Sequence, residues 1–447
     1  MIYSMLACLA ALAALLWMLR AERLSLGLPF AYLASLLLIH VPGAFAHWVG
    51  ESMLDGGEYV VIGIRYTAIG AVCFVAGVWL ARRAVPIRAR PGPADRADFA
   101  RFCLIGGWVF VYGLTALARV PSLGAVIDTG GSIWMLGVLM GLRSALLSGN
   151  VQRAVLWGGA LAVYPAFMLL LGGFLSYGAA AVIVVISVLV VFARSYLRAT
   201  IGVAFAALVG LTVFVNYFDH RADIRESVWG GEAMGSRLSA VSGVFTDFHL
   251  IDLGSEKDLL ALDQRLNQNM FVGLAATRIG EGQVDYLNGK SVTDGLLSLI
   301  PRALWPDKPV TGGSGQIVAD MTGLSLNEDT SWGVGNVMEF YINFGVPGLV
   351  VGFLALGGMI GFLDIRGAAA ERRGDLGQMP LYFLPAVALI QPGASLVEIS
   401  GSAGAALVAA FGWRWLWTMR MAGQARRAAT TRAIAPRLPQ SGVGPAE

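Results

Sequence analysis

Two basic side chains on a stiff, irregular segment have the chemistry to hold a phosphate group. Arg302 and Lys308 lie within residues 301–309, where three prolines fix the backbone and block a helix. Two cations held in place suit a di-anionic phosphate. Trp305, an amphipathic side chain typical of a membrane surface, lies between them. The segment therefore predicts an anion-binding site; the competing interpretation is a structured loop whose charges only meet water.

Glu339 is the carboxylate best placed to act as a general base. It lies at the start of the apolar segment 338–363, and Gly345, Pro347 and Gly348 interrupt that segment soon afterwards. Such breaks are tolerated at membrane depth only where the backbone faces protein or a wet cavity. A carboxylate at the mouth of a cavity could accept a proton from an entering hydroxyl. An acid that merely complements a helix N-terminus is the alternative.

Three other features compete for a functional role. Arg65 lies inside the apolar segment 59–81, where an arginine either lines a cavity or snorkels to the interface. Glu398 lies between the last two apolar segments and fits a simple turn. The glycine-rich residues 311–315 have the composition of an anion-binding nest. They match no nucleotide-binding motif, however, and a flexible loop is the better interpretation.

The composition places the chain in the membrane class. Of its 447 residues, 56% are hydrophobic and 14% are charged, against about 25% charged in a typical globular domain. The net charge of +3 is too small to predict a nucleic-acid partner. Neither the three cysteines nor the four histidines have the spacing of a metal site.

Eleven apolar segments reach or approach the roughly 20 residues that span a bilayer. They are residues 2–19, 28–47, 59–81, 102–118, 133–148, 154–172, 176–193, 199–217, 338–363, 379–396 and 400–418. The fifth is short and carries Arg143, so it could instead lie in the interface. The predicted fold is an all-α polytopic integral membrane protein with about 11 transmembrane helices.

The distribution of arginine orients the chain. Arginines gather in every second connection, including the Pro- and Arg-rich linker 82–101, and are nearly absent from the others. The positive-inside rule then places the N-terminus outside and the C-terminus inside. We divide the chain into an N-terminal bundle of about eight helices, a periplasmic loop, C-terminal membrane helices and a basic, disordered cytoplasmic tail. These regions are residues 1–217, 218–337, 338–418 and 419–447.

The predicted periplasmic loop has a net charge of −7 and contains all three lysines of the protein. Leucines at spacings of three and four predict a helix over residues 256–277. Ser291 and Asp294 fit a capping box that opens a second, shorter helix. We therefore expect helices packed over the mouth of the membrane bundle.

Several motifs between residues 260 and 365 resemble one known enzyme family. They are residues 264–267, 289–291, 300–309 and 339–348. Together they resemble the Wzy-type O-antigen and exopolysaccharide repeat-unit polymerases (oligosaccharide repeat unit polymerases). The pattern Pro-Arg-x-x-Trp-Pro-x-Lys-Pro at residues 301–309 is the most specific. Before residue 260, the helices match only in layout.

The resemblance implies a GT-C-like glycosyltransferase at the periplasmic face of the bacterial inner membrane. Its donor would be a growing glycan on undecaprenyl diphosphate, and its acceptor a single repeat unit on the same carrier. Inversion at the anomeric carbon requires a base for the acceptor hydroxyl and cations for the departing diphosphate. The resemblance implies no cofactor. As partners it implies membrane lipid, a flippase and a chain-length regulator.

The resemblance also implies roles for individual residues. Glu339 would be the base, and Arg302 and Lys308 would hold the diphosphate. Family members often have an arginine near a Gly/Ser turn between two middle helices, but residues 172–178 contain none. We therefore expect other side chains to bind the substrate, namely Arg265, Arg278, Arg65, Trp305, Asn336 and Tyr341.

Two other functions remain open. A ligase that moves finished glycan to a different acceptor would use a histidine of the outer loop as its base, and His220 or His249 could serve. A lipid-linked oligosaccharide flippase or secondary transporter is less favoured, because the ionisable residues cluster at one face and no inverted repeat is apparent. Asp307, Glu398 and His220 are the rivals of Glu339 as base.

Overall fold

The computed structural model is entirely helical, without a strand, in the part of the chain that it describes. That part comprises residues 1–22, 24–50, 53–85, 92, 95–114, 123–172, 175–193, 195–246, 248–300, 305, 313–325 and 333–434. The all-helical class predicted from the composition is confirmed.

Among the described residues, seven helical stretches are long and apolar enough to cross a membrane. They are α1 (Ile2–Glu22), α2 with α3 (Leu28–Leu38 and Val41–Val49), α4 (Gly57–Ala84), α6 with α7 (Leu123–Asp128 and Gly130–Leu147), α10 (Tyr196–Trp229), α16 (Asn336–Arg373) and α18 (Leu396–Ile434). These stretches mark a membrane-associated protein.

Helices also lie at the remaining predicted spans. They are α5 (Arg96–Trp108) with η1 (Val109–Gly113), α8 (Val151–Gly172), α9 (Leu175–Phe192) and η3 (Leu376–Gln378) with α17 (Met379–Leu389). α17 has 11 residues, so the predicted span 379–396 is too long. The predicted span 28–47 corresponds to the apolar stretch Leu28–Val49, although a turn at Ile39 and His40 divides that stretch into α2 and α3. α18 continues to Ile434, so the predicted disorder of 419–447 is wrong for its first part.

The centre of the bundle is the parallel pair α4 and α16, which pack closely through glycine. A side-chain carbon at Gly77 would lie 2.2 Å from the backbone oxygen of Leu354, and one at Gly357 would lie 2.2 Å from that of Phe74. Real Cβ atoms do not come this close, so only glycine permits the contact. Small residues at such crossings let helix backbones approach within a membrane.

Buried ion pairs hold the C-terminal half of α16 to its neighbours. Arg82 of α4 meets Asp364 at 3.2 Å, and both side chains are almost fully buried. Arg96 and Arg143, from α5 and α7, lie 2.6 and 2.9 Å from the two oxygens of Glu371. Arg143 therefore binds a carboxylate inside the protein, and the segment 133–148, for which an interfacial position was the alternative, belongs to a stretch long and apolar enough to cross a membrane.

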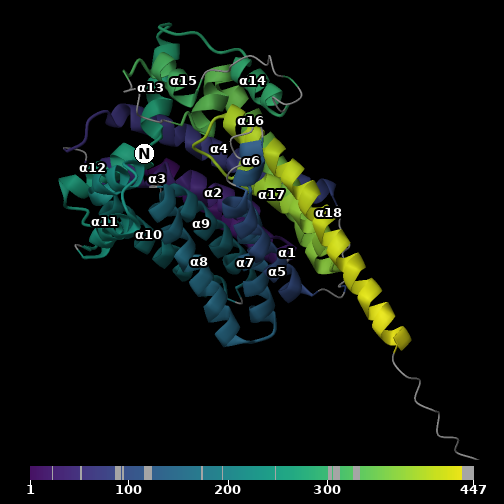
Figure 1. The fold of residues 1–447 in the computed structure, drawn as a ribbon. Helices are drawn as coiled ribbons and strands as arrows, with labels where there is room; N and C mark the ends of the chain where they lie inside the picture. The colour runs from purple at the N-terminus through teal and green to yellow at the C-terminus, as the bar shows by residue number, and fades with distance from the viewer. Residues whose placement is uncertain are drawn as a thin grey trace, which may run out of the picture.

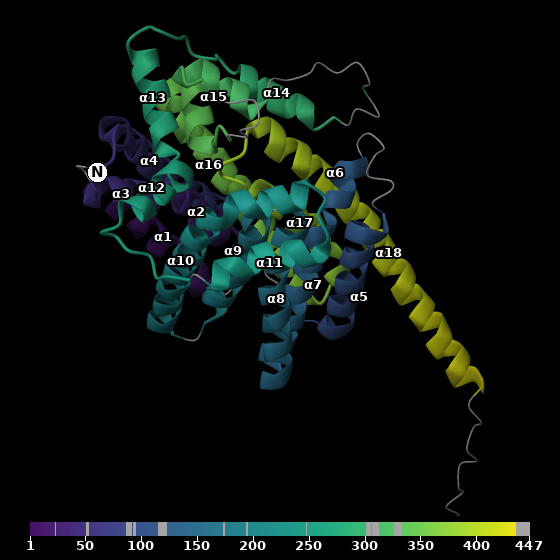
Figure 2. The ribbon, with the colours of Figure 1, turned by 60° about the vertical axis from the view of Figure 1, so that its left-hand side comes forward.

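Three short helices cover the opposite end of the bundle. They are α13 (Asn269–Gly280), α14 (Lys290–Ser298) and α15 (Ser314–Thr322). Figures 1 and 2 show them side by side across the start of α16, and we call this the capped end. α11 (Met234–Thr246) and α12 (Glu256–Leu266) lie beside the long α10. The expectation of helices packed over one mouth of the bundle is met.

Three local predictions for this region are wrong in detail. The helix expected over 256–277 is two helices, because the chain turns at Asn267 and Gln268, and the backbone N–H of Gln268 donates to Ile39. The cap of α14 is Gly289, in the left-handed region with φ +87°, so Ser291 is not the cap. Ser314 and Gly315, expected in a flexible loop, open α15.

Candidate functional site

Glu339 lies in the first turn of α16, fully buried at the capped end. Its Oε2 accepts a hydrogen bond from the backbone N–H of Leu396 at 2.7 Å. Leu396 is the first residue of α18, so the carboxylate satisfies one of the N–H groups that every helix leaves free at its start. The other oxygen, Oε1, is buried and has no hydrogen-bond partner among the described residues.

Among the residues that the structure describes, the charged groups that act on the Glu339 carboxylate are acidic. Glu398 and Asp294 both act on its carboxylate, and the Ser291 hydroxyl lies beside it. A buried carboxylate that keeps one oxygen unpartnered next to two other acids is costly for the fold. This arrangement is the type found at catalytic acids and bases, although structural networks also produce it.

The break predicted after Glu339 is present. Phe344 and Gly345 depart from helical geometry, with φ/ψ of −145°/18° and 66°/−148°. The carbonyl of Ile342, released from the helix, accepts the backbone N–H of Leu287 at 2.8 Å. A loop from the protein therefore occupies the break, as required at membrane depth.

Asn336 is predicted to bind substrate, but its contacts hold neighbouring segments of the chain to α16. Its Oδ1 accepts a hydrogen bond from the Tyr32 hydroxyl at 2.8 Å, and its Nδ2 donates to the Ala394 carbonyl at 3.3 Å. Its backbone N–H donates to Pro392 at 2.8 Å. It ties α2 and the loop before α18 to α16, and thus supports Glu339 one turn later.

Tyr341 lies on a different side of α16 from Glu339. Its ring stacks on Tyr66 of α4, with centroids 4.6 Å apart, and the Tyr286 ring lies 6.3 Å away. The Tyr66 hydroxyl donates to that of Tyr341 at 3.5 Å. Arg65 precedes Tyr66 and is exposed. The structure thus brings Tyr341 near the helix that carries Arg65, but on a face distinct from the carboxylate.

Arg265 and Arg278 lie in two different environments. Arg278 binds the Asp320 carbonyl and Gln283 Oε1, both at 3.1 Å, and so joins the end of α13 to α15. Burial, followed by the nearby Arg221 and Arg225 of α10, lowers the pKa of Arg265 to about 10. Arg265 therefore remains a cation at neutral pH, in a basic group between α10 and α12.

The proposed diphosphate cations Arg302 and Lys308, and the rival base Asp307, fall outside the described residues. Trp305 is described and is 37% exposed.

The rivals of Glu339 have more ordinary surroundings. Glu398 forms a capping box with Ser395: the N–H of Ser395 donates to its Oε2 at 2.7 Å, and its own N–H donates to the Ser395 hydroxyl at 3.2 Å. His220 Nδ1 lies 3.0 Å from the Asn216 carbonyl, one turn earlier on α10. His249 Nε2 lies 3.4 Å from Asp258.

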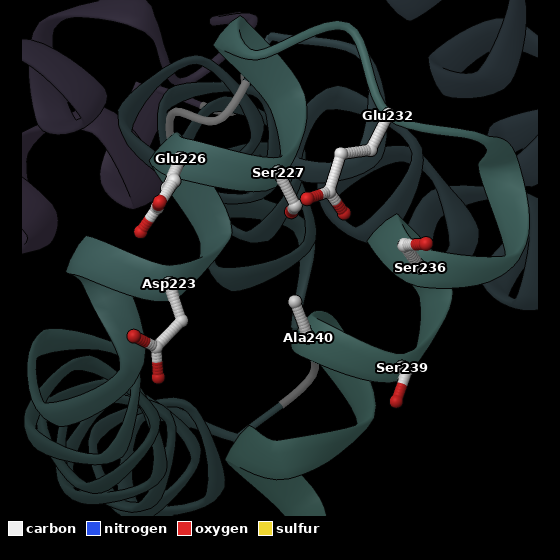
Figure 3. A pocket seen from close by; sticks show the side chains of 7 residues that line it. All are labelled: Asp223, Glu226, Ser227, Glu232, Ser236, Ser239 and Ala240. Carbon is white, nitrogen blue, oxygen red and sulfur yellow. The ribbon is translucent and has the colours of Figure 1, made fainter.

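A cavity of about 490 Å³ lies elsewhere, between the end of α10 and α11. Figure 3 shows carboxylates and serine hydroxyls around it. The lining residues are Asp223, Glu226, Ser227, Glu232, Ser236, Ser239 and Ala240. None is a predicted site residue, and an acidic lining would repel a diphosphate. Among the described residues, no group of three or more acidic, histidine or cysteine side chains could hold a metal ion.

A family model described as "Domain of unknown function (DUF8712)" matches residues 53–372. The chain belongs to this family. The match contains α4 and nearly all of α16, and with them Glu339 and the helix break, whereas Leu396 lies beyond it. No curated protein and no solved structure matches the chain.

Two residues near Glu339 were not predicted to belong to the site. Asn343 is four residues further along α16, and its Nδ2 donates to the Glu339 carbonyl at 2.7 Å. Ser291, which fits a helix cap in the sequence, is buried beside the carboxylate. The spacing of four between Glu339 and Asn343 was a visible signal. Nothing local in the sequence indicates that Ser291 reaches α16.

Proposed function

We propose that this chain polymerises oligosaccharide repeat units carried on undecaprenyl diphosphate, at the periplasmic face of the bacterial inner membrane. The observation that supports the proposal most is the Glu339 carboxylate, which is fully buried and whose Oε1 has no hydrogen-bond partner within the described part of the chain. It stands at the start of a broken helix, under the capped end. Resemblance of residues 301–309 and 339–348 to the repeat-unit polymerases supplies the substrate class.

In the proposed reaction, Glu339 Oε1 removes the proton from a hydroxyl of the acceptor sugar. That oxygen attacks the anomeric carbon of the donor glycan, and the bond from this carbon to the diphosphate oxygen breaks. The electron pair leaves with the diphosphate, whose charge the cations Arg302 and Lys308 stabilise. Arg65, Arg265 and Arg278 are the further candidates for this contact. The new glycosidic bond has inverted configuration.

This proposal includes the orientation expected from the arginine pattern. The capped end would face the periplasm, with the N-terminus on that side and the C-terminus in the cytoplasm. The buried pairs of Arg82, Arg96 and Arg143 would then lie toward the cytoplasm. Lipid-linked substrate would reach Glu339 from the outer leaflet, close to the plane of the headgroups.

The test uses a strain that lacks the chain. We expect it to accumulate single lipid-linked repeat units and to lose long glycan, and we expect the wild-type chain to restore length. Glu339→Gln keeps the shape and can still accept the Leu396 N–H, but it removes the proton acceptor. Loss of a general base slows a reaction by about 10²–10⁴-fold, so this variant should restore no long glycan.

The matched control is Glu58→Gln, which changes a carboxylate in the first turn of α4. It should restore wild-type length. Long glycan in the Glu339→Gln strain, at equal protein level, would refute Glu339 as base. A deletion strain that makes full-length polymer but fails to attach it would point to the ligase instead.

A further inference from the structure

Ser291 and Asn343 form a buried hydrogen-bonded unit against Glu339. Their exposed fractions are 2% and 1%. Asn343 Nδ2 donates to the Ser291 hydroxyl oxygen at 2.7 Å and to the Glu339 carbonyl at 2.7 Å. Asn343 Oδ1 accepts the backbone N–H of Gly289 at 3.0 Å. Every polar atom of the Asn343 amide therefore points at the first turn of α14 or at the residue that carries the carboxylate.

This arrangement fixes what the Ser291 hydroxyl can do. A hydroxyl has one hydrogen to donate and lone pairs to accept with. Because the Asn343 amide donates to the oxygen, the hydrogen of Ser291 is left for another acceptor. The acidic group beside it is the Glu339 carboxylate. Electrostatics therefore favours donation from Ser291 toward that carboxylate, since hydrogen bonds to ionised groups are the stronger kind.

The helix break makes this contact possible. In a continuous helix the Ile342 carbonyl would accept from a residue four positions later, but here it accepts the Leu287 N–H. The Leu287–Ile342 and Gly289–Asn343 hydrogen bonds hold the start of α14 against the last turn before the break. These two bonds set the position of Ser291 relative to Glu339. Leu396 N–H holds the carboxylate from the α18 side.

We propose that Ser291 and Asn343 are positioning residues, which together with the Leu396 N–H hold the Glu339 carboxylate so that Oε1 faces the acceptor hydroxyl. The catalytic part of this inference rests on the proposed function. The geometric part concerns only how the carboxylate is held. In the described part of the chain, the charged groups facing it are Asp294 of α14 and Glu398 of α18, and neither is a donor when ionised.

The experiment compares Ser291→Ala with Ser187→Ala. Ser187 is also a buried helical serine, 1% exposed, whose hydroxyl donates to the Ile183 carbonyl in α9. The substrate is lipid-linked repeat unit extracted from the strain that lacks the chain, given to purified protein. Misplacing a catalytic group by about 1 Å can cost about 100-fold. We expect kcat of Ser291→Ala to fall about 10- to 100-fold with KM within about threefold of wild type.

Ser187→Ala should leave kcat within about twofold of wild type, in keeping with a hydroxyl that only bonds its own helix. If kcat of Ser291→Ala is unchanged, including the case in which only KM changes, the positioning role is overturned. A fall of equal size in Ser187→Ala overturns it as well, because the effect would then follow from any buried serine.

A second measurement needs no turnover. A hydrophobic carbodiimide reacts with buried carboxyl groups, and mass spectrometry reports the modified fraction of Glu339 directly. We expect Ser291→Ala and Asn343→Ala each to change the labelling rate of Glu339 at least threefold, whereas Ser187→Ala and Asn216→Ala leave it unchanged. Asn216 is a buried helical amide that likewise bridges to a distant segment. Unchanged labelling of Glu339 in Ser291→Ala overturns the inference, whether or not the wild-type protein polymerises. Failure of the wild-type protein to polymerise would refute only the proposed function.

Discussion

Gly345→Ala tests whether the break in α16 needs glycine. With φ 66° and ψ −148°, Gly345 occupies a region that is essentially closed to other residues and costs about 1–3 kcal/mol when forced. An added Cβ would lie 3.1 Å from the hydroxyl of Tyr286, an exposed side chain that can move aside. The strain in the backbone therefore dominates the cost.

The chain could relieve this strain only if residues 344 and 345 adopted helical geometry, so that α16 became a continuous helix. Closure would bring the ring of Pro347 against the Asn343 carbonyl, four residues earlier, at a cost of about 3 kcal/mol or more. It would also lose the Leu287 bond to Ile342, worth about 1 kcal/mol. The strained break is the cheaper state, so Gly345→Ala should lower the free energy of unfolding by about 1–3 kcal/mol.

The assay is reversible unfolding in mixed micelles, with Gly202→Ala as control. A Cβ at Gly202 meets nothing within 4 Å, and the residue lies within helix α10, where alanine should stabilise by up to about 1 kcal/mol. The two variants should therefore differ in sign. Equal or greater stability of Gly345→Ala than of Gly202→Ala would refute the strained geometry of the break.

Three further predictions follow from the charges. Arg302→Ala should slow glycan transfer roughly 30- to 1000-fold, as for a lost oxyanion donor. Arg302→Lys should also be slow, because lysine cannot form the two parallel hydrogen bonds of a guanidinium. Wild-type glycan length in either strain would contradict the assignment. Arg82→Met should destabilise the protein by about 3–5 kcal/mol, because it leaves Asp364 buried without its cation, and adding Asp364→Asn should recover part of the loss in the same unfolding assay. No recovery would mean that Asp364 is already held neutral. Reporter fusions at Gly254 and Gly423 should report opposite sides of the membrane, and the same side for both would overturn the predicted orientation.

The parts of the fold that sequence reasoning captured depend on local physics. The apolar composition predicts a helical membrane protein, and Gly345 with Pro347 predicts the break in α16, since both act through their own backbone. The turn that separates α2 from α3 was missed even though it precedes Pro42, because an apolar run does not reveal where it is interrupted. For Glu398 the sequence predicted only a turn, and the Ser395–Glu398 capping box explains this residue without catalysis.

The contacts that define the candidate site could not be predicted, because they are long-range. Ser291 meets Asn343 across 52 positions, and Leu396 meets Glu339 across 57. A serine three residues before an aspartate fits a helix cap equally well, and only the fold shows that Gly289 takes that place. The position of Glu339 before the break predicts its role, and the structure adds its burial and an oxygen without a hydrogen-bond partner among the described residues.

The ion pairs of α16 impose an order on the insertion of the chain into the membrane. Arg82 leaves the ribosome 282 residues before Asp364, and Arg96 leaves 275 residues before Glu371. During that interval α4, α5 and α7 hold arginines whose carboxylate partners have not yet been made. An unpaired charge in the bilayer is expensive, so these helices must keep their charged ends at the water interface until α16 arrives. A chain that stops before Asp364 would therefore be a substrate for quality-control proteolysis rather than a stable half-bundle.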